Sequence, residues 1–185
     1  TTVAATDSYA CKVNTSNVSG AGTDAKVYAV FYGTEGKTDE MRLTNKTDNF
    51  EKGKTDLFKL ELAQIGDLTK MRIWHDNGGF AGSAWHLASV EMENLKSHRI
   101  STFRADRWLS KKEGLVCEIP VGQVQEVDDD GQRVNVDVEA ESLIDYEVRV
   151  VTADTDKAST DANVSITLFG EDRHGIKVDT GPRKL

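Results

Sequence analysis

The sequence predicts an all-β fold: an eight-stranded antiparallel β-sandwich, followed by the start of a second copy. Three observations predict it. Short segments alternate between apolar and other residues, turn-forming residues separate most of these segments, and the N-terminal stretch recurs near the C-terminus. The chain has only two prolines, and no long segment shows the 3.6-residue period of an amphipathic helix. Many short strands with regular turns are typical of a sandwich.

The strand signals follow one another along the chain. Tyr9–Thr15 alternates, and Lys26–Tyr32 carries apolar or aromatic side chains on both faces. Thr38–Thr44 carries Met41 and Leu43, and Leu57–Leu62 places Phe58, Leu60 and Leu62 on one face. The remaining predicted strands are Leu68–His75, Trp85–Glu93, Arg99–Phe103 and Leu115–Pro120.

The repeat indicates the domain organisation. At an offset of 137 residues, eight identities fall in register, from Tyr9 and Tyr146 to Gly33 and Gly170. We therefore predict one whole domain at residues 7–122, an acidic linker at 123–143 whose end can form a strand, and an incomplete second copy at 144–185. The run Asp128–Asp130 in the linker lacks the spaced ligands of an EF-hand and indicates a solvated turn. Arrays of such units more often bind or scaffold than catalyse.

Composition excludes some classes of function. A formal net charge of −8 argues against nucleic-acid binding. No apolar run approaches the length of a transmembrane helix, and Thr1–Asp7 lacks the segments of a signal peptide. Cys11 and Cys117 lack metal-ligand spacing and are expected to be buried thiols, with a disulfide as the alternative. Sequons, which would matter in a secreted protein, occur at Asn14, Asn17, Asn45 and Asn163.

Three loops carry a candidate metal site. If the strands reverse at every turn, Ser16–Ala25, Asn45–Asp56 and Asp76–Ala84 share one end of the sandwich. Carboxylates, amides and carbonyls from several loops are what Ca²⁺ binds, and the glycines leave carbonyls accessible. The alternative is that these residues simply form turns. The predicted ligands are Gly20, Gly22, Asp24, Asp48, Asn49, Glu51, Asp76 and Asn77, with Asp56 nearby.

Several motifs occur in one fixed order between Tyr9 and about Pro120, and together they resemble the PLAT domain, the β-sandwich of polycystins, lipoxygenases and clostridial alpha-toxin. The tandem copies are most similar to multi-PLAT lipoxygenase-homology proteins of cilia and stereocilia, and the segment Arg72–Asn77 is also similar to the polycystin-1 type. The motifs are Gly20–Ala25, Phe31–Gly36, Asn49–Phe58, Ile65–Leu68, Met71–Gly78, Trp85–Leu87, Phe103 and Arg107–Leu109.

The resemblance implies a module without catalytic activity that attaches proteins to membranes or to partners, in some members with Ca²⁺. Lipoxygenase PLAT domains take calcium ligands from the matching loops. One departure is that lipoxygenases read Asn-Asp-Phe-Glu where this chain reads Asp48-Asn49-Phe50-Glu51, and the second copy has Ser159 in place of Gly22. The expected partners are a protein, anionic membrane lipid and neighbouring PLAT repeats. The expected location is the cytoplasmic face of a membrane, a cilium or an axoneme, with an extracellular location as the alternative.

The sequence does not favour an enzyme. It contains no nucleophile elbow, phosphate loop or HExxH motif, and its histidines (His75, His86, His98 and His174) are scattered and expected at strand ends or on the surface. Trp85 and Trp108 are expected in the core. Trp74, at a strand end, and Phe80, at a loop tip, are the predicted contacts to lipid or a partner, although the tip can also fold back onto the sandwich.

Overall fold

The computed structural model describes residues 5–79, 83–137, 146–171, 177–180 and 183–185, and these residues form only strands, turns and loops. The chain divides into two units, Thr1–Ser142 and Leu143–Leu185. The described residues hold no helix that is long and apolar enough to span a membrane.

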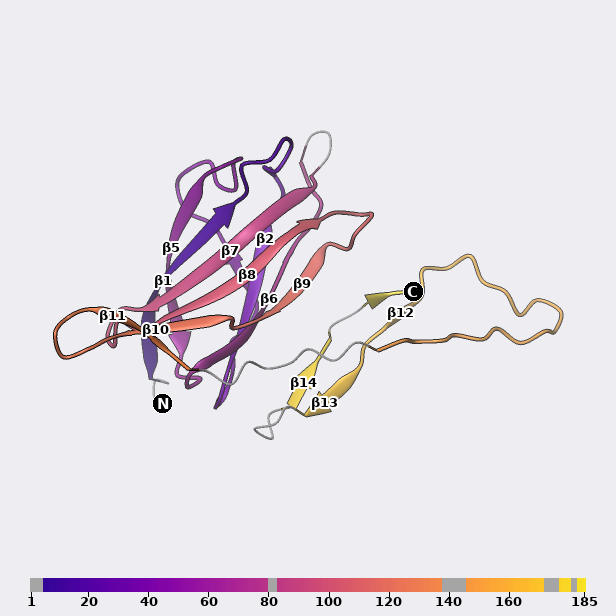
Figure 1. The fold of residues 1–185 in the computed structure, drawn as a ribbon. Helices are drawn as coiled ribbons and strands as arrows, with labels where there is room; N and C mark the ends of the chain where they lie inside the picture. Colours follow the sequence, from indigo (N-terminus) through magenta and orange to yellow (C-terminus); the bar gives the residue numbers. More distant parts are fainter. Residues whose placement is uncertain (1–4, 80–82, 138–145, 172–176, 181–182) are drawn as a thin grey trace. The chain divides into compact units, whose positions relative to one another are not determined.

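The first unit is an antiparallel β-sandwich, as predicted (Figure 1). One sheet has six strands in the order β11-β10-β8-β7-β1-β5, and the other has the order β3-β2-β6-β9 with β4 paired to β2. The strands are β1 (Thr6–Thr15), β2 (Val27–Gly33), β3 (Gly36–Lys37), β4 (Met41–Leu43), β5 (Thr55–Ala63), β6 (Leu68–His75), β7 (Trp85–Asn94), β8 (Ile100–Leu109), β9 (Val116–Pro120), β10 (Gln123–Val127) and β11 (Arg133–Val136).

The core lies between the two sheets and follows the alternation of the sequence. On β2, Val27, Ala29 and Phe31 are fully buried and face the other sheet. The indole of Trp85, also fully buried, donates a hydrogen bond from Nε1 to Thr15 Oγ1 at 3.0 Å, so its polar atom is satisfied inside the core.

Both cysteines are buried free thiols, which confirms that prediction. Cys11 lies on β1 of the six-stranded sheet and Cys117 on β9 of the other sheet, so the two strands are not neighbours. Burial raises the pKa of the Cys11 thiol to about 12, and the group is therefore a packing element of the core at neutral pH.

All eight predicted strands are present, but the sandwich also has elements that were not predicted. β3 is an extra strand of two residues, and β8 continues to Leu109, beyond the predicted end at Phe103. Trp108 at the end of β8 is only partly buried, and its ring meets the His86 ring edge-on at 4.9 Å on the outer surface. The prediction of a core role for Trp108 was therefore wrong, because its position on β8 points away from the other sheet.

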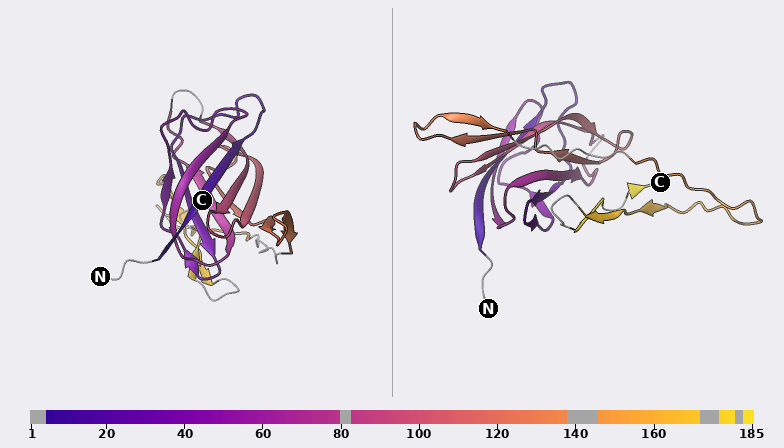
Figure 2. Two further views of the ribbon diagram at one scale, coloured as in Figure 1. Left: turned by 90° about the vertical axis from the view of Figure 1, so that its left-hand side faces the viewer. Right: turned by 60° about the horizontal axis from the view of Figure 1, so that its bottom comes forward.

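The segment predicted as an acidic linker begins with a β-hairpin of the sandwich. β10 pairs with β8, β11 pairs with β10, and Figure 2 shows the hairpin projecting from the sheet. Val124 is fully buried. The turn at Asp128–Asp130 is exposed, and Asp128 Oδ1 accepts hydrogen bonds from the N–H groups of Asp130 at 3.0 Å and Gln132 at 2.8 Å. The turn is solvated, as predicted.

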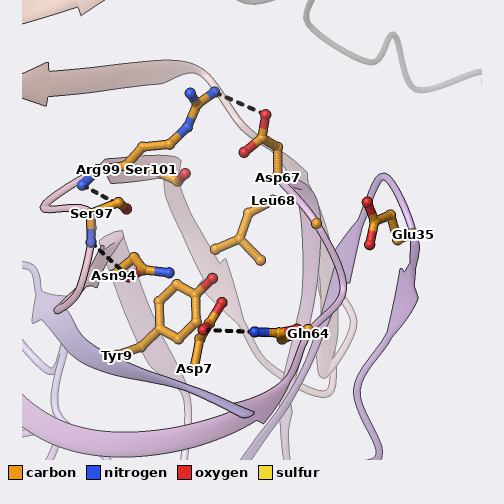
Figure 3. A pocket seen from close by; sticks show the side chains of 11 residues that line it. Asp7, Tyr9, Glu35, Gln64, Asp67, Leu68, Asn94, Ser97, Arg99 and Ser101 are labelled. Carbon is orange, nitrogen blue, oxygen red and sulfur yellow. Dashed lines mark hydrogen bonds and ion pairs between the residues drawn. The ribbon is translucent and has the colours of Figure 1, made fainter. Parts of the chain in front are cut away.

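Ion pairs of Arg99 join the hairpin to the rest of the domain, at the end of the sandwich opposite the predicted metal site. Its guanidinium pairs with Glu126 of β10 and, at 3.5 Å, with Asp67 of the β5–β6 loop. Figure 3 shows the Arg99–Asp67 ion pair beside a polar hollow of about 260 Å³ that Tyr9 also lines. Burial raises the pKa of the Tyr9 phenol, which therefore stays protonated.

The second unit is built differently from the start of the first unit. Residues 146–164 form no strand, and Tyr146 and Val150 are 71% and 61% exposed, whereas their counterparts Tyr9 and Val13 are buried. β1 forms between β5 and β7, and at the repeat offset both partner strands fall beyond Leu185. An equivalent second sandwich therefore stays a prediction. The unit contains two short antiparallel pairs, β12 (Ser165–Ile166) with β15 (Arg183–Lys184) and β13 (Phe169–Glu171) with β14 (Lys177–Asp179).

The hairpin is expected to contribute to the stability of the first domain. Val124→Ala removes two buried methyl groups and should lower the free energy of unfolding by about 2 kcal/mol. Val134→Ala on β11 is the matched control because Val134 is 41% exposed. Urea unfolding of both variants measures the difference, and equal, small losses would mean that the hairpin does not belong to the folding unit.

Candidate metal centre

The described residues of the three predicted loops lie at one end of the sandwich (Figure 1). They connect β1 to β2, β4 to β5 and β6 to β7. Thr23 joins all three: its N–H donates to Phe50 O at 3.1 Å, and its hydroxyl donates to Ser83 O at 3.1 Å. Thr23 is buried, so these bonds are shielded from water and hold the loops in register.

Glycine allows the first two loops to touch. A Cβ on Gly22 would lie 3.0 Å from Lys52 N and 3.2 Å from Phe50 O, both backbone atoms. Gly20 has a φ of +75° and makes the turn that leads into this contact. The two predicted glycines thus have a clear role in loop geometry, and ligation through their carbonyls stays a prediction.

The second loop is anchored by the side chain between its two acidic residues. The ring of Phe50 is buried, 5.8 Å from the Phe58 ring and 5.3 Å from the Trp85 ring. Its backbone is left-handed, with φ of +63°, which is costly for a bulky residue. The buried carboxylate of Asp56 stabilises this conformation, since Oδ2 accepts the Phe50 N–H at 2.7 Å. Because the ring and the backbone of Phe50 are fixed, Asp48 and Glu51, which lie on either side of it in the sequence, are also held in place.

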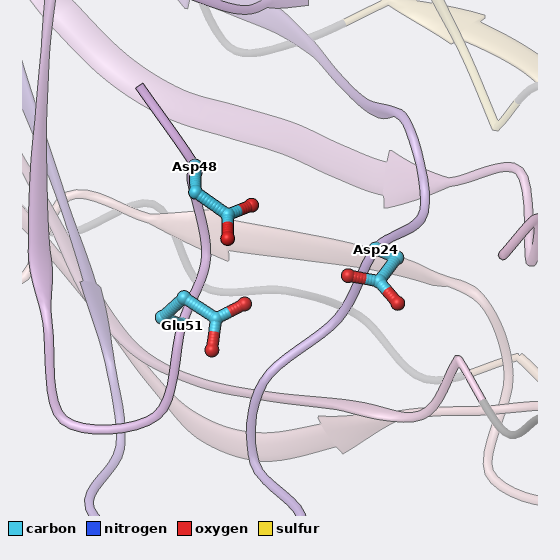
Figure 4. A group of neighbouring side chains, drawn as sticks. All are labelled: Asp24, Asp48 and Glu51. Carbon is cyan, nitrogen blue, oxygen red and sulfur yellow. The ribbon is translucent and has the colours of Figure 1, made fainter. Parts of the chain in front are cut away.

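The result is a group of three carboxylates. One oxygen from each of Asp24, Asp48 and Glu51 lies within 4.8 Å of the others. Figure 4 shows Asp48 and Glu51 on one segment and Asp24 on a facing segment, with their carboxylates directed toward the space between. At this separation, each pair of negative charges repels by about 1 kcal/mol even at the dielectric constant of water. A bound cation relieves this repulsion.

The donors fit Ca²⁺ better than a transition metal. Three carboxylates offer up to six oxygens, Ca²⁺ takes six to eight, and the group contains no nitrogen or sulfur ligand. Asn49 lines the same hollow, of about 200 Å³, beside Asp24 and Asp48. Its Oδ1 accepts a hydrogen bond from the Thr47 hydroxyl at 3.1 Å. The swapped order of Asp48 and Asn49 relative to lipoxygenases therefore keeps both oxygen donors at the site.

Asp76 is not a member of this group of three, and its role as a metal ligand stays a prediction. Its Oδ1 accepts the N–H groups of Gly78 at 2.9 Å and Lys26 at 3.0 Å. These hydrogen bonds, that of Gly78 first, lower the pKa of the Asp76 carboxyl. The residue shapes the third loop and joins it to the start of β2. The third loop still borders the group, because a Cβ on Gly79 would lie 3.0 Å from Asp24 Cβ.

Three further residues were predicted to belong to a site: Asn77 as a metal ligand, and Trp74 and Phe80 as contacts to lipid or a partner. Asn77 lines a different hollow, beside Lys111 and Lys112, and its carbonyl accepts the Ser83 hydroxyl at 2.9 Å. Trp74 is partly buried on the outer face of β6. Phe80 lies outside the described residues, so its contact with lipid or a partner stays a prediction.

His75 is the last residue of β6, which confirms the predicted position at a strand end, and it is buried instead of lying on the surface. Its side chain is 1% exposed, with Nε2 bonded to Leu109 O at 3.0 Å and Nδ1 accepting the Asn77 N–H at 3.2 Å. These partners require the neutral ring, protonated at Nε2. The signal was available in the sequence, because His75 has the same parity along β6 as the buried Met71 and Ile73.

The chain is similar in sequence to a known family of domains. Residues 9–117 match the PLAT/LH2 domain family. The chain belongs to this family. The PLAT/LH2 chain is 34% identical over 167 residues to the human (Homo sapiens) lipoxygenase homology domain-containing protein 1, covering 88% of this chain and 7% of that protein. It is 39% identical over 93 residues to the polycystin family receptor for egg jelly of Mus musculus, covering 49% of this chain and 4% of that protein.

A solved structure supports the fold assignment. The PLAT/LH2 chain resembles coral 8R-lipoxygenase with a TM-score of 0.57 and 24% identity, over 63% of this chain and 17% of that chain. That lipoxygenase is described as activated by calcium through a C2-like domain. The PLAT/LH2 chain thus spans a small part of the length of each of these relatives, and at this identity the structural likeness shows the fold alone.

The buried His75 predicts a pH-dependent stability. Burial lowers the pKa of its imidazole below the ordinary value of 6.5. Between these two pKa values the unfolded chain binds a proton that the folded chain does not, so stability is present above about pH 6.5 and is lost as pH falls. The slope is at most about 1.4 kcal/mol per pH unit. Unfolding measured from pH 7.5 to 5 should show this slope in the parent chain and a smaller one in His75→Gln, and equal slopes would contradict the assignment.

Calcium binding is expected to be weak and to depend on the three carboxylates. Open loop sites of this kind bind Ca²⁺ with dissociation constants on the order of 10⁻⁴–10⁻³ M. Removing one charge in Asp48→Asn or Glu51→Gln should weaken binding by about tenfold or more, because a carboxylate ligand is lost. The control is Asp39→Asn, an exposed residue outside the group. Isothermal titration calorimetry measures these affinities, and an unchanged affinity in both ligand variants would exclude the site.

Proposed function

We propose that this chain is a binding module without catalytic activity in a multi-PLAT scaffold protein, and that it attaches a protein partner close to a membrane. The length of the match to the lipoxygenase homology relative carries the proposal. The match spans 167 residues, whereas the PLAT/LH2 domain match covers only residues 9–117. The similarity to this relative therefore extends beyond one domain. This supports a tandem arrangement, in which several weak contacts add up through effective concentration.

Calcium is proposed to assist this attachment. The carboxylates of Asp24, Asp48 and Glu51 form a negative end of the domain. A cation bound there would neutralise that end and allow it to approach an acidic protein partner.

The proposed location is the cytoplasmic face of a membrane, a cilium or an axoneme. An extracellular location is the alternative, and the exposed sequon at Asn17 would accept a glycan there.

The second candidate is a Ca²⁺-dependent lipid-binding domain that targets a larger membrane protein or lipid enzyme. The observation in its favour is the fold shared with coral 8R-lipoxygenase, whose C2-like domain is described as the means of calcium activation. The carboxylate group suits this function as well, because bound Ca²⁺ can bridge protein carboxylates and lipid phosphates.

Liposome flotation separates the two candidates. We expect the chain not to float with vesicles of phosphatidylcholine and phosphatidylserine in EDTA, since its net charge is −8. Under the scaffold proposal, millimolar Ca²⁺ adds little flotation. Strong flotation that requires Ca²⁺ and is lost in Asp48→Asn, but kept in Asp39→Asn, would establish the lipid-binding candidate instead. Turnover of a lipid substrate by the purified chain would exclude both.

A further inference from the structure

The outer face of the sheet formed by β2, β4 and β6 carries a cluster of basic and aromatic side chains. Its residues follow from the strand register, which places Arg42 beside Tyr28, Tyr28 beside Trp74, and Lys37 and Lys70 on either side of Tyr32. The cationic face is defined by Tyr28, Lys37, Arg42, Lys70, Arg72 and Trp74.

The aromatic rings hold the basic groups in place. The rings of Tyr28 and Trp74 are stacked, with centroids 5.8 Å apart and planes at 18°. The Arg72 guanidinium lies 5.1 Å from the centre of the Trp74 ring, and the Lys70 ammonium lies 4.7 Å from that of Tyr32. Such cation–π contacts leave the charged groups at the surface but restrict their motion, which lowers the entropy cost of binding an anion.

The charge of this face is opposite to that of the whole chain. Lys37, Arg42, Lys70 and Arg72 lie together in a protein whose formal net charge is −8. Glu118 of β9 sits beside Arg72 in the register and is the nearest acidic neighbour along that row. The face therefore attracts an anionic partner, whereas the carboxylate end of the domain repels one in the absence of calcium.

The Arg72 guanidinium does not use all of its N–H donors within the part of the chain that the structure describes. Its Nε is buried and has no hydrogen-bond partner among the residues that the structure describes. An unsatisfied buried donor is costly, and the planar guanidinium is suited to a carboxylate that accepts two parallel hydrogen bonds. Because Nε itself is buried, a ligand would meet the outer N–H groups of the guanidinium, whose planar arrangement suits a carboxylate.

We propose that the cationic face binds an extended acidic peptide segment of a partner protein. Lys70 and Arg72 are two residues apart on β6, so their side chains emerge about 6.6–6.8 Å apart, which is also the spacing of alternate side chains in an extended peptide. Carboxylates at every second position of the peptide would meet these two cations, and a following side chain would cover Trp74.

A membrane suits this face less well than a peptide. Membrane insertion requires aromatic side chains that project from the surface, whereas Tyr28 and Trp74 stack on each other and are partly buried. The inference rests on the proposed attachment function and names the partner chemistry for it. The cationic face borders the carboxylate hollow at Arg42, which lines that hollow beside Asp24 and Asp48, whereas Lys70 and Arg72 lie on β6.

The test uses the whole chain in EDTA and a fluorescein-labelled peptide of alternating glutamate and alanine, with a lysine–alanine peptide as the charge control. Fluorescence anisotropy should show saturable binding of the acidic peptide that weakens with added salt. The double variant Lys70→Gln/Arg72→Gln should lose affinity by about tenfold, since two ion pairs are removed. Arg42→Gln, at an exposed position, should weaken binding without a risk to folding.

The matched control is Lys59→Gln/Arg104→Gln, which removes the same charges from exposed positions on the other sheet. It should keep the parent affinity within about twofold. Equal losses in both double variants, or no saturable peptide binding by the parent chain, would overturn the proposal. So would Ca²⁺-free binding to phosphatidylserine vesicles that depends on Lys70 and Arg72 in the absence of peptide binding. Because no calcium is present, these outcomes are independent of the flotation test of the proposed function.

Discussion

The geometry of the carboxylate end depends on the burial of one aromatic side chain in a left-handed backbone conformation. Phe50 packs against Phe58 and Trp85, and this packing holds the strained residue between the loop's two acidic neighbours. The conformation is kept by the hydrogen bond from the Phe50 N–H to buried Asp56. The energy of the hydrophobic core thus offsets both the backbone strain and the repulsion between nearby carboxylates.

The two surfaces of the domain have opposite electrostatic characters for structural reasons. At the loop end, short connections that need Asp, Asn and Gly for their turns bring carboxylates together. On the outer face of β2 and β6, long side chains such as Lys70 and Arg72 lie across aromatic rings and shield them from water. The proposed calcium end and the proposed peptide-binding face therefore call for partners of different chemistry.

Much of the sandwich could be predicted from the sequence because alternation and turns are local signals. The β10–β11 hairpin was missed because an edge hairpin packs on one face only, so Val124 stands among polar and acidic neighbours that look like a linker. Of the candidate site, Asp24, Asp48 and Glu51 could be placed at one end from strand reversal alone. The hydrogen bonds from the Lys26 and Gly78 N–H groups to the Asp76 carboxylate could not be predicted, because they depend on the three-dimensional arrangement of the loop and β2.

The contact at Gly22 has a consequence for a protein built of many such repeats. Ser159 occupies the corresponding position of the second copy, and in the first domain a Cβ there would lie 3.0 Å from a backbone nitrogen of the facing loop. A sandwich of the first type with serine at this position would have to hold the two loops a few tenths of an ångström farther apart. If the carboxylates bind Ca²⁺ as proposed, repeats with glycine and repeats with serine at this position would differ in calcium affinity, and an array containing both would respond over a range of calcium concentrations instead of at a single threshold.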